Sequence, residues 1–184
     1  MKKIALYSYL PMRYQIKRQR RMTSANDFRF EEIELQRHIT DFKDGRNYAK
    51  RWAAQVVCNA LSDIDLSDTI LFCIPASSHH SNVRRYKKFS QMVCQTLNMV
   101  NGFDFIQVNG KRKKAHIDHV HELEEKINDF VQITQNLKGK KVMVFDDITT
   151  TSKTADAFID FLTALGAEVR MAFFLAKTKN YKFN

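Results

Sequence analysis

Apolar residues along this chain fall into two patterns, short continuous runs and longer stretches with helical spacing. The short runs are rich in β-branched and aromatic residues, which predicts strands at residues 1–10, 69–74, 103–108, 142–145 and 168–175. In the longer stretches apolar residues recur every three or four positions, which predicts helices at residues 30–42, 49–61, 89–99 and 155–162. Residues 122–137 fit either a helix or a helix followed by a strand. A chain of 184 residues with these elements is long enough for one α/β domain with a sizeable core.

The stretch from Val142 to Thr154 carries the clearest chemical pattern. Four apolar residues predict a strand that is buried on both faces, and two adjacent carboxylates, Asp146 and Asp147, close it. A loop rich in hydroxyl groups follows and leads into a helix; its residues are Thr149, Thr150, Thr151, Ser152, Lys153 and Thr154. The amino terminus of a helix attracts an anion, whereas the two carboxylates suit hydroxyl groups or a metal ion beside it. The pattern therefore predicts a ligand with both a phosphate and a polyol, such as a sugar phosphate.

A second polar loop follows the strand at residues 69–74, again at a carboxyl end, where α/β sheets bind ligands. It begins with Pro75, Ala76, Ser77 and Ser78 and continues as a small polar loop to residue 82. A basic cluster follows, with Arg84, Arg85, Lys87 and Lys88. Cationic side chains after a serine-rich loop are suited to pyrophosphate.

The charge is strongly basic and unevenly distributed. The formal net charge is +10, and residues 1–60 carry 13 Lys and Arg against 6 Asp and Glu. One basic cluster comprises Arg13, Lys17, Arg18, Arg20 and Arg21. This balance suits polyanionic partners, either phosphate-rich small molecules or nucleic acid. The alternative is a solvated basic surface with no such partner.

The cysteines and histidines of the chain limit which other kinds of site are expected. Three widely spaced cysteines in apolar surroundings, Cys58, Cys73 and Cys94, are typical of reduced thiols in a cytoplasmic protein. No run approaches the length of a transmembrane helix, so no membrane association is expected. Residues 109–121 form a basic insertion with three histidines, His116, His119 and His121. Their spacing, with no cysteine nearby, favours a basic loop over a transition-metal site.

The motif at residues 142–154 resembles the phosphoribosyl-pyrophosphate (PRPP) motif of type I phosphoribosyltransferases. That motif has four apolar residues, two acidic residues, two variable residues and then Thr-Thr-Gly-x-Thr. Thr150, Thr151 and Thr154 match it, and Ser152 replaces the glycine. A nucleotide P-loop is excluded because both of its glycines are missing. A phosphatase Asp-x-Asp motif is excluded because these carboxylates are adjacent. Receiver domains carry their acidic pair near the first strand.

Four shorter segments resemble the ComF-like branch of this family, which is associated with DNA uptake. Residues 42–46 resemble a helix that ends in Lys-Tyr-x-Gly, and residues 74–76 resemble a Val-Pro-Val-Pro loop. Residues 87–91 resemble Arg-Gly-Phe-Asn-Gln, and residues 175–178 resemble Leu-Ala-Arg-Thr. The resemblance covers roughly residues 38–178. The zinc module that precedes the branch's domain is absent from this sequence.

The resemblance implies a doubly wound, mainly parallel sheet with helices on both faces. It further implies that residues 1–184 form one phosphoribosyltransferase-like domain, with a basic and helical extension at 1–62 and a PRPP-binding core at 63–178. The implied ligands are PRPP and Mg²⁺. Asp146 and Asp147 would bind the ribose hydroxyls, and residues 149–154 would bind the 5′-phosphate. Pyrophosphate would contact the loop at 75–78 together with Arg84, Arg85 and Lys87. Mg²⁺ would come with PRPP, with Asp146 and Asp147 as potential direct ligands, and residues 109–121 would form a lid.

Three functions follow as hypotheses. The first is a phosphoribosyltransferase that transfers phosphoribosyl to an unidentified nitrogen acceptor and releases pyrophosphate. The second is a non-catalytic accessory protein of the competence type that binds PRPP, a nucleotide or nucleic acid. The third is an unrelated α/β protein with a converged loop. Ser152 is expected to limit the close backbone approach that glycine allows, and Phe173, Phe174, Tyr181 and Phe183 are candidates for contacting a nucleobase. The oligomeric state stays open.

Overall fold

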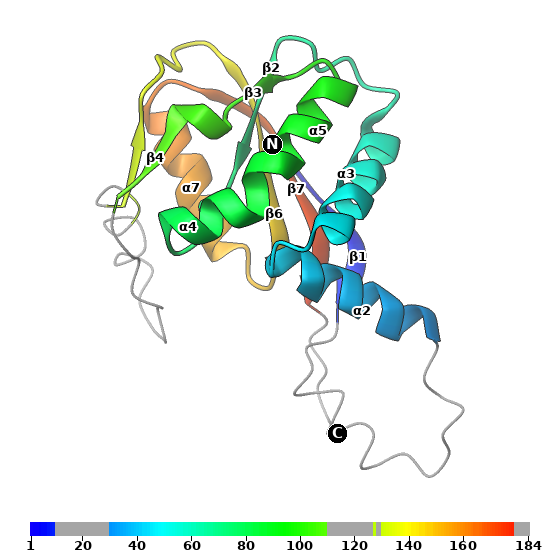
Figure 1. Cartoon of the computed structure of the whole chain (residues 1–184). Coiled ribbons are helices and arrows are strands. Elements are labelled where there is room, and N and C mark those ends of the chain that lie inside the picture. Colours follow the sequence, from blue (N-terminus) through cyan, green and yellow to red (C-terminus); the bar gives the residue numbers. More distant parts are fainter. Residues whose placement is uncertain (10–29, 110–126, 128–129, 179–184) are drawn as a thin grey trace.

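A parallel sheet forms the centre of the protein in the computed structural model, which describes residues 1–9, 30–109, 127 and 130–178 (Figure 1). Within these residues the sheet has five strands in the order β1-β7-β6-β2-β3, and every neighbouring pair is parallel. The strands are β1 (Lys2–Tyr9), β2 (Thr69–Cys73), β3 (Val100–Asn101), β6 (Lys141–Thr149) and β7 (Glu168–Thr178). All five residues of β2 are buried, as the continuous apolar run predicts for a strand covered on both faces.

Alternating side chains of the central strands supply two separate hydrophobic clusters, one on each face of the sheet. Met143 and Phe145 of β6 join the cluster with helices α2 (Phe30–Lys43), α3 (Asn47–Leu61) and α5 (Lys88–Thr96). Val142 and Val144 join the opposite cluster. That cluster also includes residues of α7 (Lys153–Ala164) and of the antiparallel strand pair β4 (Ile106–Val108) and β5 (Val131–Ile133). Successive side chains of a strand point to opposite faces of the sheet, so both faces are apolar and both are covered by helices. The predicted doubly wound fold is confirmed.

The segment after β2 differs from the predicted polar loop at 76–82. Its last four residues form α4 (His79–Asn82), which continues through a π-helical turn, η2 (Val83–Lys87), directly into α5. Ser78 begins this helix because its side-chain oxygen accepts a hydrogen bond from the backbone N–H of Ser81 at 3.2 Å. Single π turns are frequent at functional sites, and this one carries Arg84 and Arg85.

Other predicted elements have different bounds in the structure. Residues 103–105 form a short 3₁₀ helix, η3 (Phe103–Phe105), so only the end of the predicted strand at 103–108 is extended, as β4. β6 continues four residues beyond Phe145 because β7, which ends at Thr178, pairs with it as far as Thr149. The acidic pair therefore lies within the strand and does not close it. In the described part of the chain, no helix is long and apolar enough to cross a membrane.

Gly45, between α2 and α3, fixes the position of the π turn. Its φ of +74° is a left-handed conformation, and a Cβ placed there would lie 2.6 Å from Arg84 Cγ and 2.8 Å from the Arg84 carbonyl oxygen. A side chain at this position is thus excluded both by the backbone conformation and by the backbone of η2. Lys50, which is 7% exposed, donates from Nζ to the same carbonyl at 3.1 Å.

Replacing Gly45 with alanine should therefore displace η2 as well as strain the turn. We expect Gly45→Ala to lower the free energy of unfolding by roughly 2–4 kcal/mol, measured by denaturant unfolding. Gly139→Ala is the matched control, because Gly139 has a φ of +70° and no atom within 4 Å of the added Cβ. The control should lose only about 1–2 kcal/mol. Equal losses in the two variants would show that the contact with η2 carries no energy.

Candidate functional site

Two polar segments meet at the carboxyl edge of the sheet because β2 and β6 are neighbours in register. Cys73 pairs with Phe145, and the backbone N–H of Ile74 donates to the Phe145 carbonyl at 2.8 Å. The loop that starts at Pro75 therefore leaves the sheet beside Asp146 and Asp147, which are still part of β6. This edge is where open α/β sheets bind ligands.

The two carboxylates of the acidic pair are held by different groups. Asp146 Oδ1 accepts hydrogen bonds from the Tyr86 hydroxyl at 3.1 Å and from the backbone N–H of Asp147 at 2.8 Å. Asp147 Oδ1 accepts from the N–H of Ile148 at 2.8 Å. Asp147 Oδ2 lies 3.0 Å from Arg85 Nη1, yet this buried oxygen has no donor with hydrogen-bond geometry among the described residues. The acidic pair therefore does not lie in a surface turn.

Burial and mutual repulsion dominate the electrostatics of this group. Burial raises the pKa of Asp146 well above the usual carboxyl range, and the neighbouring Asp147 carboxylate raises it further. The pKa of Tyr86 is also raised, first by its complete burial and then by Asp147 and Asp146. Burial disfavours the charge of Arg85, but the adjacent Tyr86 and Asp147 outweigh this effect and raise its pKa. The guanidinium is therefore the counter-charge of the acidic pair.

Packing under the π turn fixes Arg85 and Tyr86. The Tyr86 ring is fully buried and contacts Phe42 of α2 and Phe145 of β6, with ring centroids 6.1 Å and 6.4 Å away. Arg85 Nε donates to the Lys43 carbonyl at the end of α2 at 3.1 Å. Both side chains are thus anchored to elements outside η2, and their direction toward β6 follows from tertiary contacts.

The hydroxyl-rich loop joins β6 to the amino terminus of α7. Ser152 precedes this helix with a φ of +61°, the left-handed conformation that glycine favours, so the loop keeps that backbone without a glycine. The Ser152 side chain makes no cap on the helix and instead lies 3.1 Å from the Thr149 hydroxyl. Thr150 and Thr178 hydroxyls lie 3.0 Å apart, and Lys153 is exposed. The amino end of α7 therefore remains without a side-chain cap from Ser152.

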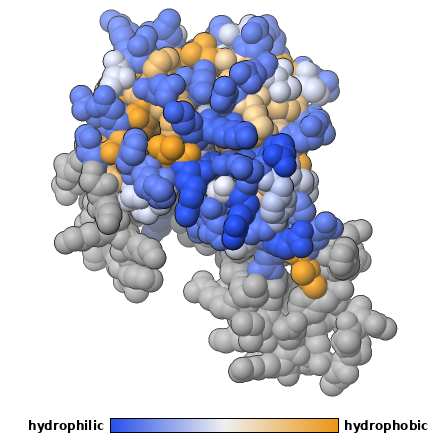
Figure 2. All heavy atoms as spheres, viewed as in Figure 1, coloured by the Kyte–Doolittle hydropathy of each residue, from blue (hydrophilic) through white to orange (hydrophobic). Residues whose placement is uncertain are grey.

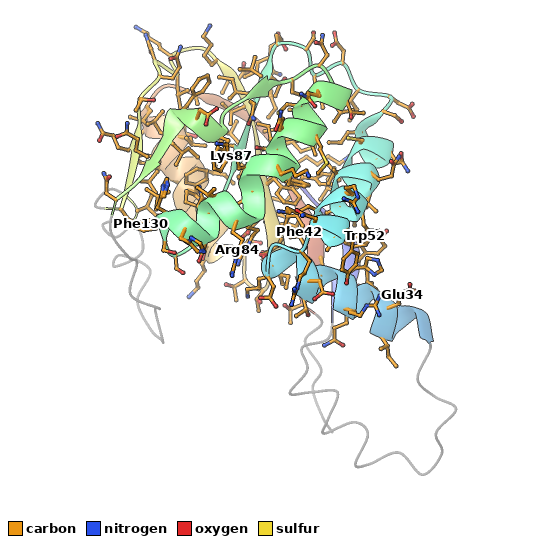
Figure 3. All side chains as sticks on the ribbon, viewed as in Figure 1. Glu34, Phe42, Trp52, Arg84, Lys87 and Phe130 are labelled. Carbon is orange, nitrogen blue, oxygen red and sulfur yellow. The ribbon has the colours of Figure 1, made fainter. Side chains whose placement is uncertain are left out.

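The loop after β2 is partly buried and partly open. Pro75 and Ala76 are buried, and the backbone N–H of Ala76 donates to Asn82 Oδ1 at 3.1 Å. Ser77 is exposed, and Ser78 is engaged in capping α4. The side chains of Arg84 and Lys87 are exposed on η2 (Figure 3). Figure 2 shows the strongly hydrophilic surface over this helix and the end of α2.

An apolar hollow lies next to these loops, between the end of β2 and α7. Ile74, Pro75, Phe130, Val131 and Phe158 line it together with Ile127, and Thr154 from the hydroxyl loop reaches its wall. Its volume of about 10 Å³ has room for about one water molecule, so no ligand group is assigned to it.

Comparison with known proteins identifies the family. The model of the phosphoribosyl transferase domain matches residues 38–184. The chain belongs to this family. The match covers the acidic pair, the hydroxyl loop, η2 and α2's carboxyl half, so the sites described above lie within the phosphoribosyltransferase domain. No curated protein matches the chain.

Solved structures with a similar arrangement are distant in sequence. UMP synthase from Leishmania donovani is 18% identical with a TM-score of 0.45, and the match covers 78% of this chain but only 24% of that one. Adenine phosphoribosyltransferase from Rhodothermus marinus is 14% identical, with coverage of 72% and 69% and a TM-score of 0.43. Hypoxanthine phosphoribosyltransferase from Staphylococcus aureus is 12% identical, with coverage of 79% and 77% and a TM-score of 0.41.

The structure separates the residues singled out in the sequence into three groups. One group comes together at the carboxyl edge of the sheet: Asp146, Asp147, Arg85 and the two loops at 75–78 and 149–154. Within this group Arg85 is already paired with Asp147. Phe173 and Phe174, the candidates for a nucleobase contact, are each 1% exposed because they alternate into the two clusters of the core. That assignment was wrong. The basic cluster at 13–21, the three histidines, the lid residues 110–121 and the tail aromatic residues lie outside the described residues.

Sequence reasoning missed Tyr86 and Lys50. Tyr86 stands in a run of basic residues, although its helical spacing to Phe89 and Val93 could have indicated that it is buried. Lys50 looks like any lysine on a helix. Burial disfavours the charged form of Lys50 and lowers its pKa, and the charges of Lys88 and Arg84 act in the same direction.

Asp146→Asn should make the folded protein more stable. The pKa of Asp146 is raised in the folded protein, so the folded state loses stability as pH rises above the unfolded pKa of about 3.9. Asparagine keeps the acceptor for Tyr86 without that loss. We expect a gain of roughly 0.5–2 kcal/mol at pH 7 that disappears below about pH 4, measured by unfolding at several pH values.

The control for this measurement is Asp160→Asn, at an exposed position in α7. A parent and an Asp146→Asn variant with the same pH dependence of unfolding would contradict the electrostatic account of the acidic pair.

Proposed function

We propose that this protein binds PRPP with Mg²⁺ and transfers its phosphoribosyl group to a nitrogen acceptor with release of pyrophosphate. One observation carries the proposal: the acidic pair, the hydroxyl loop before α7 and the cationic π turn meet at one edge of the sheet. They supply acceptors for a diol, an uncapped helix terminus for a phosphate and cations for a second anion. PRPP combines these three groups in one molecule.

The proposed roles follow this division. Asp146 and Asp147 accept hydrogen bonds from the ribose hydroxyls, because adjacent carboxylates repel an anion and favour donors. The backbone at the start of α7 binds the 5′-phosphate, with side chains from the loop 149–154. Pyrophosphate lies against the loop 75–78 and η2, where the contributing side chains are those of Arg84, Arg85 and Lys87. Lys153 is exposed near the positive end of α7, and a bound phosphate would offset its unfavourable charge there.

The donor set of this site fits Mg²⁺. Asp147 Oδ2 is a buried carboxylate oxygen without a hydrogen-bond donor among the described residues, and Mg²⁺ prefers such oxygen ligands. Asp146 and Asp147 would contribute oxygens while the remaining ligands come from PRPP and water. When bound, the ion neutralises charge on the leaving pyrophosphate. Within the described residues, no cluster of three or more metal-ligating side chains provides another site.

In such a reaction the residues of this chain position and stabilise groups, and none needs to form a covalent bond. The acidic pair fixes the ribose ring, and the cations of η2 stabilise the negative charge that develops on pyrophosphate as it leaves. A carboxylate pair beside the sugar also favours the cationic character of the ribosyl centre.

We also propose that the protein is a single domain of the ComF-like branch, located in the cytoplasm. The resemblance of residues 42–46 and 87–91 supports the branch: Gly45 contacts η2, and residues 87–91 span the end of η2 and the start of α5. Pairing of β1 with β7 supports a single domain over 1–184, with 1–62 as its extension and 63–178 as its core. The three cysteines are free thiols, which suits a reducing compartment.

The proposal is tested by PRPP binding. Asp147→Asn removes a charge that the ribose hydroxyls and the metal ion would use, so we expect PRPP affinity in the presence of Mg²⁺ to fall by more than tenfold, about 1.4 kcal/mol, in calorimetric titration. Asp160→Asn is the control at an exposed carboxylate. If the parent does not bind PRPP, or binds it as tightly as Asp147→Asn does, the assignment of the site is wrong. Pyrophosphate release across a panel of nitrogen bases then distinguishes a transferase from a binding protein.

A second candidate is a non-catalytic accessory protein of the competence type that binds PRPP, a nucleotide or nucleic acid. The net charge of +10 and the basic cluster at residues 13–21 favour a polyanionic partner.

Binding of single-stranded or duplex DNA should fall steeply with salt if this candidate is correct. Neutralising Arg18, Arg20 and Arg21 should reduce the slope of log affinity against log salt by about two to three, because up to three phosphate contacts are lost. Electrophoretic or fluorescence titration at several salt concentrations measures the slope. Absence of DNA binding at low salt would remove this candidate.

A further inference from the structure

The ion pair between Arg85 and Asp147 has an unusual combination of close charge and poor hydrogen bonding. Their side chains are 14% and 7% exposed, and Arg85 Nη1 lies 3.0 Å from Asp147 Oδ2. Nevertheless that oxygen has no donor with hydrogen-bond geometry among the described residues. The two groups therefore attract each other by charge, while the directional bond that usually accompanies such a pair is missing.

Asp147 Oδ2 can readily exchange Arg85 for a partner that binds it with better geometry. A buried carboxylate oxygen without a donor is unfavourable, and a new partner with good geometry would recover that cost. A guanidinium and a metal ion cannot both occupy the same side of one carboxylate oxygen. A cation that binds Asp147 Oδ2 from the side that faces Arg85 therefore displaces Arg85 Nη1.

Arg85 is anchored so that its charge stays nearby after such an exchange. Its Nε donates to the Lys43 carbonyl at 3.1 Å, and Nη1 is 3.5 Å from the Tyr86 hydroxyl. Tyr86 in turn donates to Asp146 at 3.1 Å, so Asp146 keeps a partner whatever Arg85 does. Movement of the guanidinium end alone is sufficient to release Asp147.

We infer that Arg85 is an exchangeable counter-ion: it pairs with Asp147 in the empty protein and passes to the pyrophosphate group when a divalent cation takes Asp147. This inference rests on the proposed function, because it assumes that the acidic pair and η2 face the same ligand. Arg85 therefore has two opposed effects. It competes with the cation for Asp147, and it strengthens binding of the complete ligand.

Mn²⁺ alone is the probe for the first effect, measured by calorimetry or by electron paramagnetic resonance without PRPP. Arg85→Gln should bind Mn²⁺ at least fivefold more tightly than the parent. Arg84→Gln is the matched control: it removes the same charge from the neighbouring exposed residue, so a general electrostatic effect would appear equally in both. In the double variant Arg85→Gln with Asp147→Asn the gain should vanish, because the gain requires that carboxylate.

PRPP in the presence of Mg²⁺ is the probe for the second effect. Here Arg85→Gln should bind more weakly than the parent by at least fivefold, the opposite sign to the Mn²⁺ result. Mn²⁺ affinities that Arg85→Gln and Arg84→Gln raise equally, or that Asp147→Asn does not reverse, would overturn the inference. If instead the Mn²⁺ results hold but the parent binds no PRPP, the competition of Arg85 with the cation for Asp147 stands, while its transfer to pyrophosphate and the proposed function both fail.

A measurement on the parent protein guards against a variant that does not fold. In arginine-labelled protein, the guanidinium signals of Arg85 in the nuclear magnetic resonance spectrum should shift when Mg²⁺ and PRPP are added. Signals that stay unchanged with Mg²⁺ and with Mg²⁺ plus PRPP would overturn the exchange.

Discussion

The structure around the carboxyl edge depends on the burial of two adjacent carboxylates at the end of β6. Two negative charges so close together disfavour each other, and burial removes the water that would screen them. The protein compensates from one direction, with the Tyr86 hydroxyl on Asp146 and the Arg85 guanidinium beside Asp147. Both groups belong to η2, so the site depends on the position of η2.

Two residues outside η2, Gly45 and Lys50, hold it in position. Gly45 allows α2 and α3 to approach the backbone of Arg84, and Lys50 satisfies the Arg84 carbonyl in the π turn. Gly45 takes its left-handed turn without the steric cost that another residue would meet, whereas burial disfavours the charge of Lys50, and both residues serve the position of Arg85. Ser152 adds a strained backbone position at the start of α7. A buried cation and a strained backbone position beside the acidic pair are the kind of cost that functional sites carry.

Much of the fold was predictable from the sequence because it depends on local periodicity. The apolar run at 70–74 predicted a buried strand, and β2 forms there as a buried parallel strand over Thr69–Cys73. α7 begins within two residues of its predicted start. The resemblance of residues 142–154 to the PRPP motif named the correct family.

The remainder depends on tertiary contacts that no local pattern contains. The helix at His79 starts at a serine cap inside an apparently polar loop, and the π turn has no sequence signature. Tyr86 acquires its role only through contact with Asp146, sixty positions later in the chain. Phe173 and Phe174 had the composition of a nucleobase site but alternate into the core. Ser152 adopts the left-handed conformation that glycine favours, which the intrinsic preference of serine does not predict.

A crystal structure of the protein with Mg²⁺ and PRPP would show whether this edge of the sheet is a PRPP site. We expect the ribose hydroxyls on Asp146 and Asp147, the 5′-phosphate at the start of α7 and the pyrophosphate against η2. A ligand bound elsewhere on the protein, or bound with its ribose away from both carboxylates, would contradict this expectation.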